Sequence, residues 1–162
     1  MKKLKSEPLT PSELRRAAVD LLSRRDHSRL ELQRKLRPKA ASDDDLETLL
    51  DELAGRHWQS DERFAEAYIN SRIQRGQGPL RLRHALREKG VAEAEIRAAM
   101  DEQDTDWKAR ALDAAGRKFG QGTDLSDPRQ KARLYRFLAY RGFSGEQISY
   151  VIDRIGRKDR TD

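Results

Sequence analysis

The sequence contains no cysteine. It therefore has no disulfide bonds, no thiolate metal ligands and no cysteine nucleophile, which fits a reducing compartment. Residues 1–5 are basic, but no long apolar run follows them. We expect neither a secretory signal nor a membrane-spanning helix, and we expect the protein to be cytoplasmic.

Recognisable catalytic and cofactor motifs are also missing. His27, His57 and His84 are far apart in the sequence and show no metal-ligand spacing, and no constellation of serine and aspartate residues accompanies them to support a hydrolytic triad. Gly76 and Gly78 resemble a fragment of a phosphate loop, but no strand precedes them and no Lys-Ser pair follows. We therefore predict a protein that is not an enzyme and has no catalytic, metal-binding or cofactor-binding residues and no cofactor.

Charged residues, in contrast, make up 38% of the 162 residues, with a formal net charge of +6 and a pI near 9.7. A basic balance favours acidic partners such as nucleic acid or a protein surface lined with carboxylates, although solubility alone is an alternative explanation. Hydrophobic residues account for 36% of the chain. This content suffices for several small cores but not for one thick core.

A helical unit with a leucine seam is written three times. The seam residues are Leu32, Leu36 and Leu46, then Leu82, Leu86 and Ile96, then Leu134, Leu138 and Ile148. The copies are offset by 50 and then 52 residues, and the spacing within each copy is the same. A period of this size is typical of stacked helical modules. We predict an all-α fold, an elongated array of three tandem three-helix, helix-turn-helix-like repeats with nine helices.

The helix start signals place the repeats along the chain. We predict flexible tails at residues 1–9 and 157–162, and repeats at residues 10–57, 58–102 and 103–156. The predicted N-caps are Thr10, Ser28, Ser42, Ser60 or Asp61, Asp104 and Ser144. Trp58 and Trp107 stand near helix starts, where packing in a core is favoured over stacking on bases.

Charge follows position within the repeat, because the middle helices are basic and the third helices acidic. The arginine fork suits bidentate contact with phosphate or carboxylate. We therefore predict a partner-binding or nucleic-acid-binding role for Arg24, Arg25, Arg34, Lys35, Arg72, Arg75, Arg81, Arg83, Arg87, Lys89, Arg133, Arg136 and Arg141. The alternative is that these side chains only pair with neighbouring acidic helices. It is weakest for Arg81, Arg83 and Arg87, beside a glycine-bounded turn.

Three stretches carry a family resemblance. The first holds Arg24, Arg25, Asp26, His27, Ser28, Glu31, Leu32, Lys35 and Leu36. The second holds Asp61, Arg63, Phe64, Ala65, Ser71, Arg72, Gly76, Gly78, Pro79, Arg81, Leu82, Leu86, Lys89 and Gly90. The third holds Phe137, Leu138, Arg141, Gly142, Phe143 and Ile148. In this order they resemble the signatures of the RecX family, the bacterial regulators of RecA recombinase.

The resemblance implies a non-enzymatic regulator that lies in the helical groove of the RecA filament on DNA. It implies inhibition of RecA ATP hydrolysis, strand exchange and co-protease action in recombination and the SOS response. The expected partner is the RecA–DNA filament, with weak direct binding to single- or double-stranded DNA as a further option, and a monomer is the simpler expectation. The residues leave two other hypotheses open: a direct DNA-binding protein with helix-turn-helix-like modules, and a helical-repeat adaptor unrelated to DNA.

Overall fold

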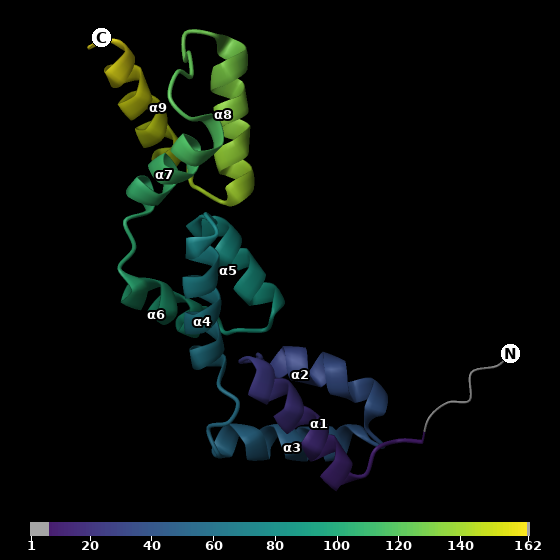
Figure 1. Cartoon of the computed structure of the whole chain (residues 1–162). Coiled ribbons are helices and arrows are strands. Elements are labelled where there is room, and N and C mark those ends of the chain that lie inside the picture. Colours follow the sequence, from purple (N-terminus) through teal and green to yellow (C-terminus); the bar gives the residue numbers. More distant parts are fainter. Residues whose placement is uncertain (1–6, 162) are drawn as a thin grey trace, which may run out of the picture. The chain divides into compact units, whose positions relative to one another are not determined.

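The computed structural model describes residues 7–161, which form nine α-helices and no strand. The helices are α1 (Pro11–Arg24), α2 (Arg29–Leu36), α3 (Asp43–Gly55), α4 (Asp61–Gln74), α5 (Pro79–Glu88), α6 (Glu93–Gln103), α7 (Trp107–Phe119), α8 (Pro128–Arg141) and α9 (Gly145–Asp159) (Figure 1). A short 3-10 helix, Arg37–Lys39, follows α2 at Pro38. None of the helices in residues 7–161 has the length and apolar character needed to cross a membrane. The predicted all-α repeat fold is confirmed.

Side-chain caps begin most of these helices at the predicted residues. Thr10, Ser28 and Ser144 each form a complete capping box with the residue three positions later. Ser42 accepts a hydrogen bond from the amide of Asp45, and Ser60 accepts one from the amide of Arg63. Each cap satisfies an amide that the helix itself leaves without an acceptor, which is why these boundaries can be read from local sequence.

One predicted cap is wrong. The N-cap of α7 is Asp106, whose side chain accepts from the amide of Ala109, and not Asp104. Asp104 instead ends the preceding turn with a left-handed backbone, at a φ of 44°. Aspartate serves both roles well, so the sequence alone does not separate two aspartates that stand two residues apart.

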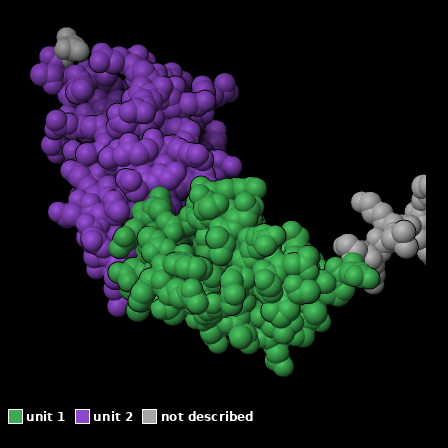
Figure 2. Space-filling view, turned by 60° about the horizontal axis from the view of Figure 1, so that its bottom comes forward, with its two compact units in different colours: residues 1–67, 87–96 green, residues 68–86, 97–162 purple. Residues whose placement is uncertain are grey.

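The chain divides into two compact units, coloured separately in Figure 2. Unit 1 contains residues 1–67 and 87–96, and unit 2 contains residues 68–86 and 97–162. Helices α4, α5 and α6 each contribute residues to both units. The three repeat boundaries stay a prediction, because the units mark where the chain is most compact and not where a repeat begins.

The core of unit 1 is built by α1, α2 and α3. Its buried residues are Leu14, Ala18, Leu32, Leu36, Leu46, Leu49, Leu50 and Leu53. The core of unit 2 is built by α7, α8 and α9 with Phe143. Its buried residues are Ala111, Ala114, Ala115, Leu134, Leu138, Phe143, Ile148 and Val151. All nine seam residues predicted from the repeat are at most 1% exposed, so the periodicity identified the core residues correctly.

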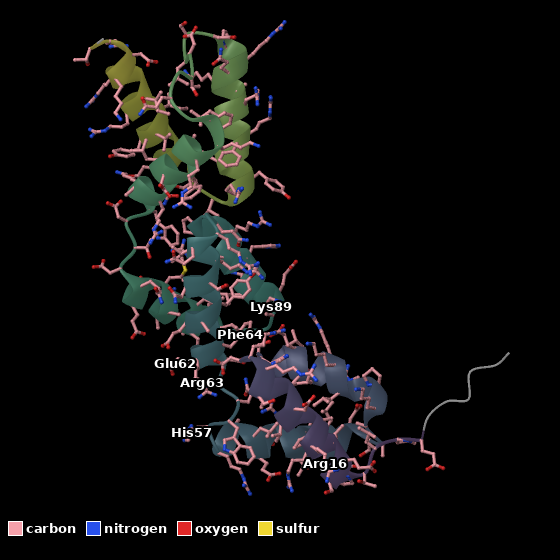
Figure 3. All side chains as sticks on the ribbon, in the orientation of Figure 1. Arg16, His57, Glu62, Arg63, Phe64 and Lys89 are labelled. Atoms are coloured by element: carbon pink, nitrogen blue, oxygen red, sulfur yellow. The ribbon has the colours of Figure 1, made fainter. Side chains whose placement is uncertain are left out.

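The two tryptophans differ in their surroundings. Trp107 is half-buried and packs against the core of unit 2, as predicted. Trp58 is 44% exposed, so the prediction that it packs in a core is wrong. The guanidinium of Arg56 lies 5.1 Å from the centre of its ring. Arg63 donates hydrogen bonds to the carbonyl groups of His57 and Trp58, and this bonding holds the turn in place (Figure 3).

The predicted flexible tails fall partly outside the described residues, since residues 1–6 and 162 are not described. Within the described part, the amide of Leu9 donates to the carbonyl of Lys39 at 2.8 Å. At the other end, α9 continues to Asp159.

Candidate functional site

The two units carry very different charges. Unit 1 has 16 basic and 17 acidic residues, whereas unit 2 has 18 basic and 11 acidic residues. The whole positive excess of the chain therefore belongs to unit 2. An acidic partner is attracted mainly to the unit with the excess.

In unit 1, the acidic residues of α3 neutralise the basic side chain at the start of α2. Arg29 lies 2.9 Å from Glu47 and 2.7 Å from Asp51. The alternative to partner binding is that the basic side chains of the middle helices only pair with neighbouring acidic helices. Arg29 is paired in this way.

Glu31 of α2 forms ion pairs with two further cations of unit 1, Arg25 and Lys89. Its carboxylate contacts Arg25 at 3.1 Å and Lys89 at 3.5 Å, and it accepts from the amide of Ser28 at 3.1 Å. Burial raises the pKa of Glu31, but the hydrogen bonds from Arg25 and Ser28 and the charges of Arg25 and Lys89 outweigh burial and hold this pKa below its ordinary value. Glu31 is thus an anion that ties Arg25 and Lys89 into unit 1.

In the same region, the side chain of Lys35 contacts the imidazole of His27. The imidazole is 2% exposed, its Nδ1 lies 3.0 Å from the carbonyl oxygen of Arg25, and its Nε2 lies 3.3 Å from the ammonium of Lys35. Burial lowers the pKa of His27, and the charges of Arg25 and Lys35 lower it further against the effect of the hydrogen bond. The ring is therefore neutral near pH 7, and Nε2 accepts a hydrogen bond from Lys35.

The remaining predicted residues of unit 1 also have partners within the chain. Arg24 pairs with Asp20 at 3.0 Å, and Arg34 donates to the carbonyl of Glu88 at 3.4 Å. Arg87 pairs with Glu93. The predicted site residues in unit 1 are Arg24, Arg25, Arg34, Lys35, Arg87 and Lys89. Each contacts a group of its own chain, which makes them poorer candidates for contact with a partner.

Helix α8 in unit 2 is different, because it has basic residues and no acidic residue. Arg129, Arg133, Arg136 and Tyr140 recur at helical spacing on its exposed surface, and we call these four residues the α8 ridge. Among residues 7–161, no carboxylate forms an ion pair with any of its three arginines. Tyr140 is 75% exposed and Tyr135, elsewhere on the same helix, is 48% exposed. Arginines without ion pairs beside exposed aromatic rings suit a polyanionic partner.

A tight joint between the start of α5 and the end of α8 fixes the end of this ridge. The amide of Gly78 donates to the carbonyl of Arg141 at 2.7 Å, and the amide of Leu80 donates to that of Gly142 at 2.9 Å. A Cβ atom at Gly78 would lie 2.5 Å from the backbone of Gly142, so only glycine fits there. The joint places the guanidinium of Arg81 5.2 Å from the ring centre of Tyr140.

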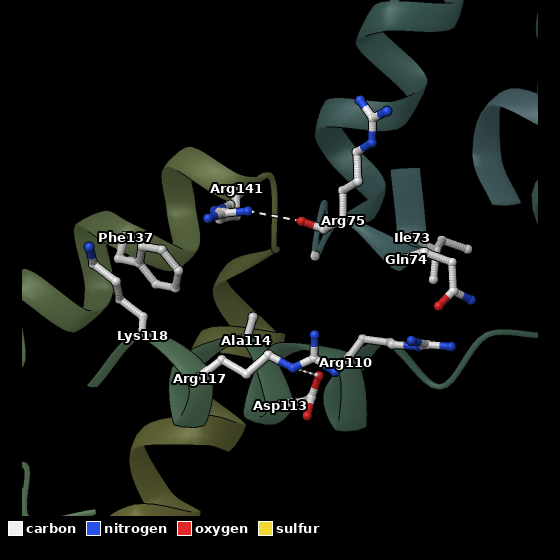
Figure 4. Close-up of a pocket in the computed structure, with 11 residues that line it drawn as sticks. Ile73, Gln74, Arg75, Arg110, Asp113, Ala114, Arg117, Lys118, Phe137 and Arg141 are labelled. Carbon is white, nitrogen blue, oxygen red and sulfur yellow. Dashed lines mark hydrogen bonds and ion pairs between the residues drawn. The ribbon is translucent and has the colours of Figure 1, made fainter. Parts of the chain in front are cut away.

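A basic hollow of about 520 Å³ lies beside the joint in unit 2 (Figure 4). Residues of α4 and its C-terminal end, α7 and α8 line it: Ile73, Gln74, Arg75, Gly76, Arg110, Asp113, Ala114, Arg117, Lys118, Phe137 and Arg141. The guanidinium of Arg141 donates to the carbonyl of Arg75 at 3.0 Å and lies 5.1 Å from the ring centre of Phe137. Five basic residues and one acidic residue surround this space.

The structure assigns seven of the predicted site residues to unit 2: Arg72, Arg75, Arg81, Arg83, Arg133, Arg136 and Arg141. Arg75 and Arg141 meet at the hollow, and Arg133 and Arg136 lie on the ridge. Arg72 stacks on Tyr68 with its guanidinium 4.9 Å from the ring centre, and Arg83 is half-buried. These seven residues are the stronger part of the prediction, because their unit holds the positive excess and none of them forms an ion pair among residues 7–161.

Sequence reasoning missed the basic residues of α7. Arg110, Arg117 and Lys118 line the hollow, but the prediction assigned the basic face to the middle helix of each repeat. A signal was present, since α7 contains four basic residues and only one acidic residue. They line the same hollow as Arg141 because of the fold, and no local sequence pattern indicates this.

These features define a class: an all-α repeat protein with one basic unit and one neutralised unit. Family models match all three repeats. The first three-helix domain of RecX matches residues 15–53, the second matches residues 60–100 and the third matches residues 104–152. This chain belongs to the RecX family.

Two similar proteins and one solved structure carry the same family name. The chain is 45% identical over 143 residues to "Regulatory protein RecX" of Pseudomonas putida (strain GB-1), covering 88% of this chain and 91% of that protein. It is 41% identical over 135 residues to "Regulatory protein RecX" of Chromohalobacter salexigens, covering 83% and 88%. The crystal structure of RecX from Lactobacillus salivarius has a TM-score of 0.75 at 21% identity, covering 90% of this chain and 96% of that one, and it supports the fold.

Proposed function

We propose that this protein is a non-enzymatic regulator that binds the RecA–DNA filament and inhibits RecA ATP hydrolysis, strand exchange and co-protease activity in recombination and the SOS response. Membership of the RecX family supports the assignment to regulation. The single structural observation that carries the filament part is the α8 ridge, whose arginines have no ion-pair partner among residues 7–161. The proposal places the protein in the cytoplasm as a monomer.

The mechanism is attachment at several weak points. A filament of protein on DNA presents the same acidic groups again and again, and modules joined in one chain bind such a partner with a raised effective concentration. Contacts with neighbouring RecA subunits favour one filament geometry and oppose the changes that accompany hydrolysis. The filament groove is the proposed location. Unit 2 supplies the attraction through its positive excess, whereas the cations of unit 1 are mainly used within the chain.

The experiment is RecA ATP hydrolysis on single-stranded DNA with added protein. The wild-type protein inhibits hydrolysis, and the variant R129A/R133A/R136A needs about tenfold more protein for the same inhibition, because three charge-assisted contacts are lost. The matched control is R15A/R37A/R56A, which removes the same charge from exposed ion pairs of unit 1. Equal weakening in both variants would remove the ridge from the proposed interface.

Direct DNA binding through the helix-turn-helix-like modules is the second candidate function, and the exposed Tyr135 and Tyr140 among the cations of α8 favour it. Co-sedimentation separates the two. Retention on assembled filaments containing an ATP analogue, and not on bare DNA, supports filament binding. Equal retention on bare DNA, falling steeply as salt rises, supports direct DNA binding instead.

A further inference from the structure

The basic hollow has a composition that points to a ligand of its own. Figure 4 shows Arg110, Asp113 and Arg117 along α7 on one side, with Arg141 on the other. The one acidic residue, Asp113, pairs with Arg117 at 3.1 Å. Arg110 and Lys118 have no ion pair among residues 7–161. The hollow therefore keeps a positive excess after its own carboxylate has been neutralised.

Part of the hollow is already in place for an anion. Arg141 is held by the carbonyl of Arg75 and by the ring of Phe137, so one guanidinium donor is used and the others remain. Phe137 in turn packs edge-on against Phe119, with ring centres 5.4 Å apart. A cation held by packing loses little side-chain entropy when it binds a ligand.

The spacing of the cations indicates what kind of anion fits the hollow. Along α7 the basic residues run from Arg110 to Lys118, a rise of about 12 Å. A single carboxylate or sulfate neutralises one point of such a row. A chain of phosphate groups carries negative charge along its length and offers each guanidinium a pair of oxygens.

We propose that this hollow binds a chain of phosphate groups through Arg110, Arg117, Lys118 and Arg141. The recognition uses side-chain cations and not a glycine-rich phosphate loop, so the absence of that motif from the sequence does not oppose it. The ligand is a short free polyphosphate, which a hollow of about 520 Å³ can hold, and binding of a nucleic-acid backbone is an outcome of the test. The site goes beyond the proposed function, because it takes a small anion and needs neither a filament nor DNA.

The test is calorimetric titration of the full chain with inorganic triphosphate and, separately, with a twelve-residue oligothymidylate, each against sulfate at equal ionic strength. We expect saturable one-to-one binding of triphosphate and none of sulfate. Binding of the oligonucleotide alone would overturn the proposal in favour of direct DNA binding.

The variant R110Q/K118Q removes two cations that have no ion pair, and we expect it to weaken binding about tenfold. The matched control K131Q/R154Q makes the same charge change at exposed positions of unit 2 outside the lining of the hollow, and we expect less than a twofold effect. Circular dichroism checks that both variants are folded.

Two further results would overturn the proposal: no saturable binding of triphosphate beyond sulfate, or equal weakening by both variants. None of these results bears on the filament proposal, whose readout is RecA ATP hydrolysis. Conversely, phosphate binding without inhibition of RecA would leave the hollow standing and remove the proposed function.

Discussion

Helices α2 and α8 are the middle helices of the first and third repeats, and they differ in what surrounds their cations. Leu32 and Leu36 in α2 and Leu134 and Leu138 in α8 are all fully buried. The basic residue that begins α2 pairs with carboxylates of α3, whereas the arginines of the α8 ridge pair with none among residues 7–161. The repeat thus preserves the packing seam and leaves the surface charge of each copy free to differ.

Substitutions in the leucine seam are expected to have the largest effect on stability. Leu36→Ala and Leu138→Ala are each expected to lower the free energy of unfolding by about 3 kcal/mol, because each leaves a cavity in a core. Urea unfolding followed by circular dichroism measures both. A clearly smaller loss at one of the two positions would show that the copies are not equivalent in packing.

The joint between α5 and α8 gives the second largest predicted effect. A Cβ at Gly142 would lie 2.3 Å from the Cβ of Arg81, and the φ of Gly142 is +98°. Gly142→Ala is therefore expected to cost about 2 kcal/mol in the free energy of unfolding. The same variant is also expected to inhibit RecA ATP hydrolysis less strongly, because the joint positions Arg81 beside Tyr140.

The control for this change is Gly116→Ala in α7. A Cβ there meets nothing within 4 Å, and glycine inside a helix is unfavourable. We expect stabilisation by about 0.5–1 kcal/mol. Loss of stability at Gly116 would mean that the Gly142 result reflects a general intolerance of side chains and not the joint.

Lowering the pH is expected to have the smallest effect on the free energy of unfolding, through His27 and Glu31 of unit 1. The pKa of His27 is below its ordinary value of 6.5, since burial opposes the charged ring. As the pH falls below 6.5, the unfolded chain takes up a proton that the folded chain resists, so the free energy of unfolding decreases. The pKa of Glu31 is also lowered, and the stability it contributes above its ordinary value of 4.5 is lost as the pH falls through its folded value.

The measurement is the free energy of unfolding between pH 7.5 and 5. The variant His27→Gln should flatten this profile. An unchanged slope in His27→Gln would show that other groups cause the acid sensitivity.

Local sequence was enough for much of this fold. The capping boxes at Thr10, Ser28 and Ser144 and the seam from Leu32 to Ile148 were predicted, because caps and helical periodicity depend on residues three or four apart. The same local reasoning chose Asp104 over Asp106 and expected Trp58 to be buried. The cap error arose because two aspartates that stand two residues apart can both serve as caps, and the error at Trp58 arose because its ring lies beside Arg56 in an exposed turn and not in a core.

The sequence by itself determined the nine helices, their buried seams and the resemblance to RecX. Only the tertiary structure decided which cations remain for a partner: Arg29 meets Glu47 and Asp51, whereas Arg141 meets the carbonyl of Arg75 and joins Arg110 at the hollow. The physical reason is range. Helix formation follows nearest neighbours along the chain, while the neutralisation of a charge depends on groups that the fold brings within about 4 Å from distant parts of the sequence.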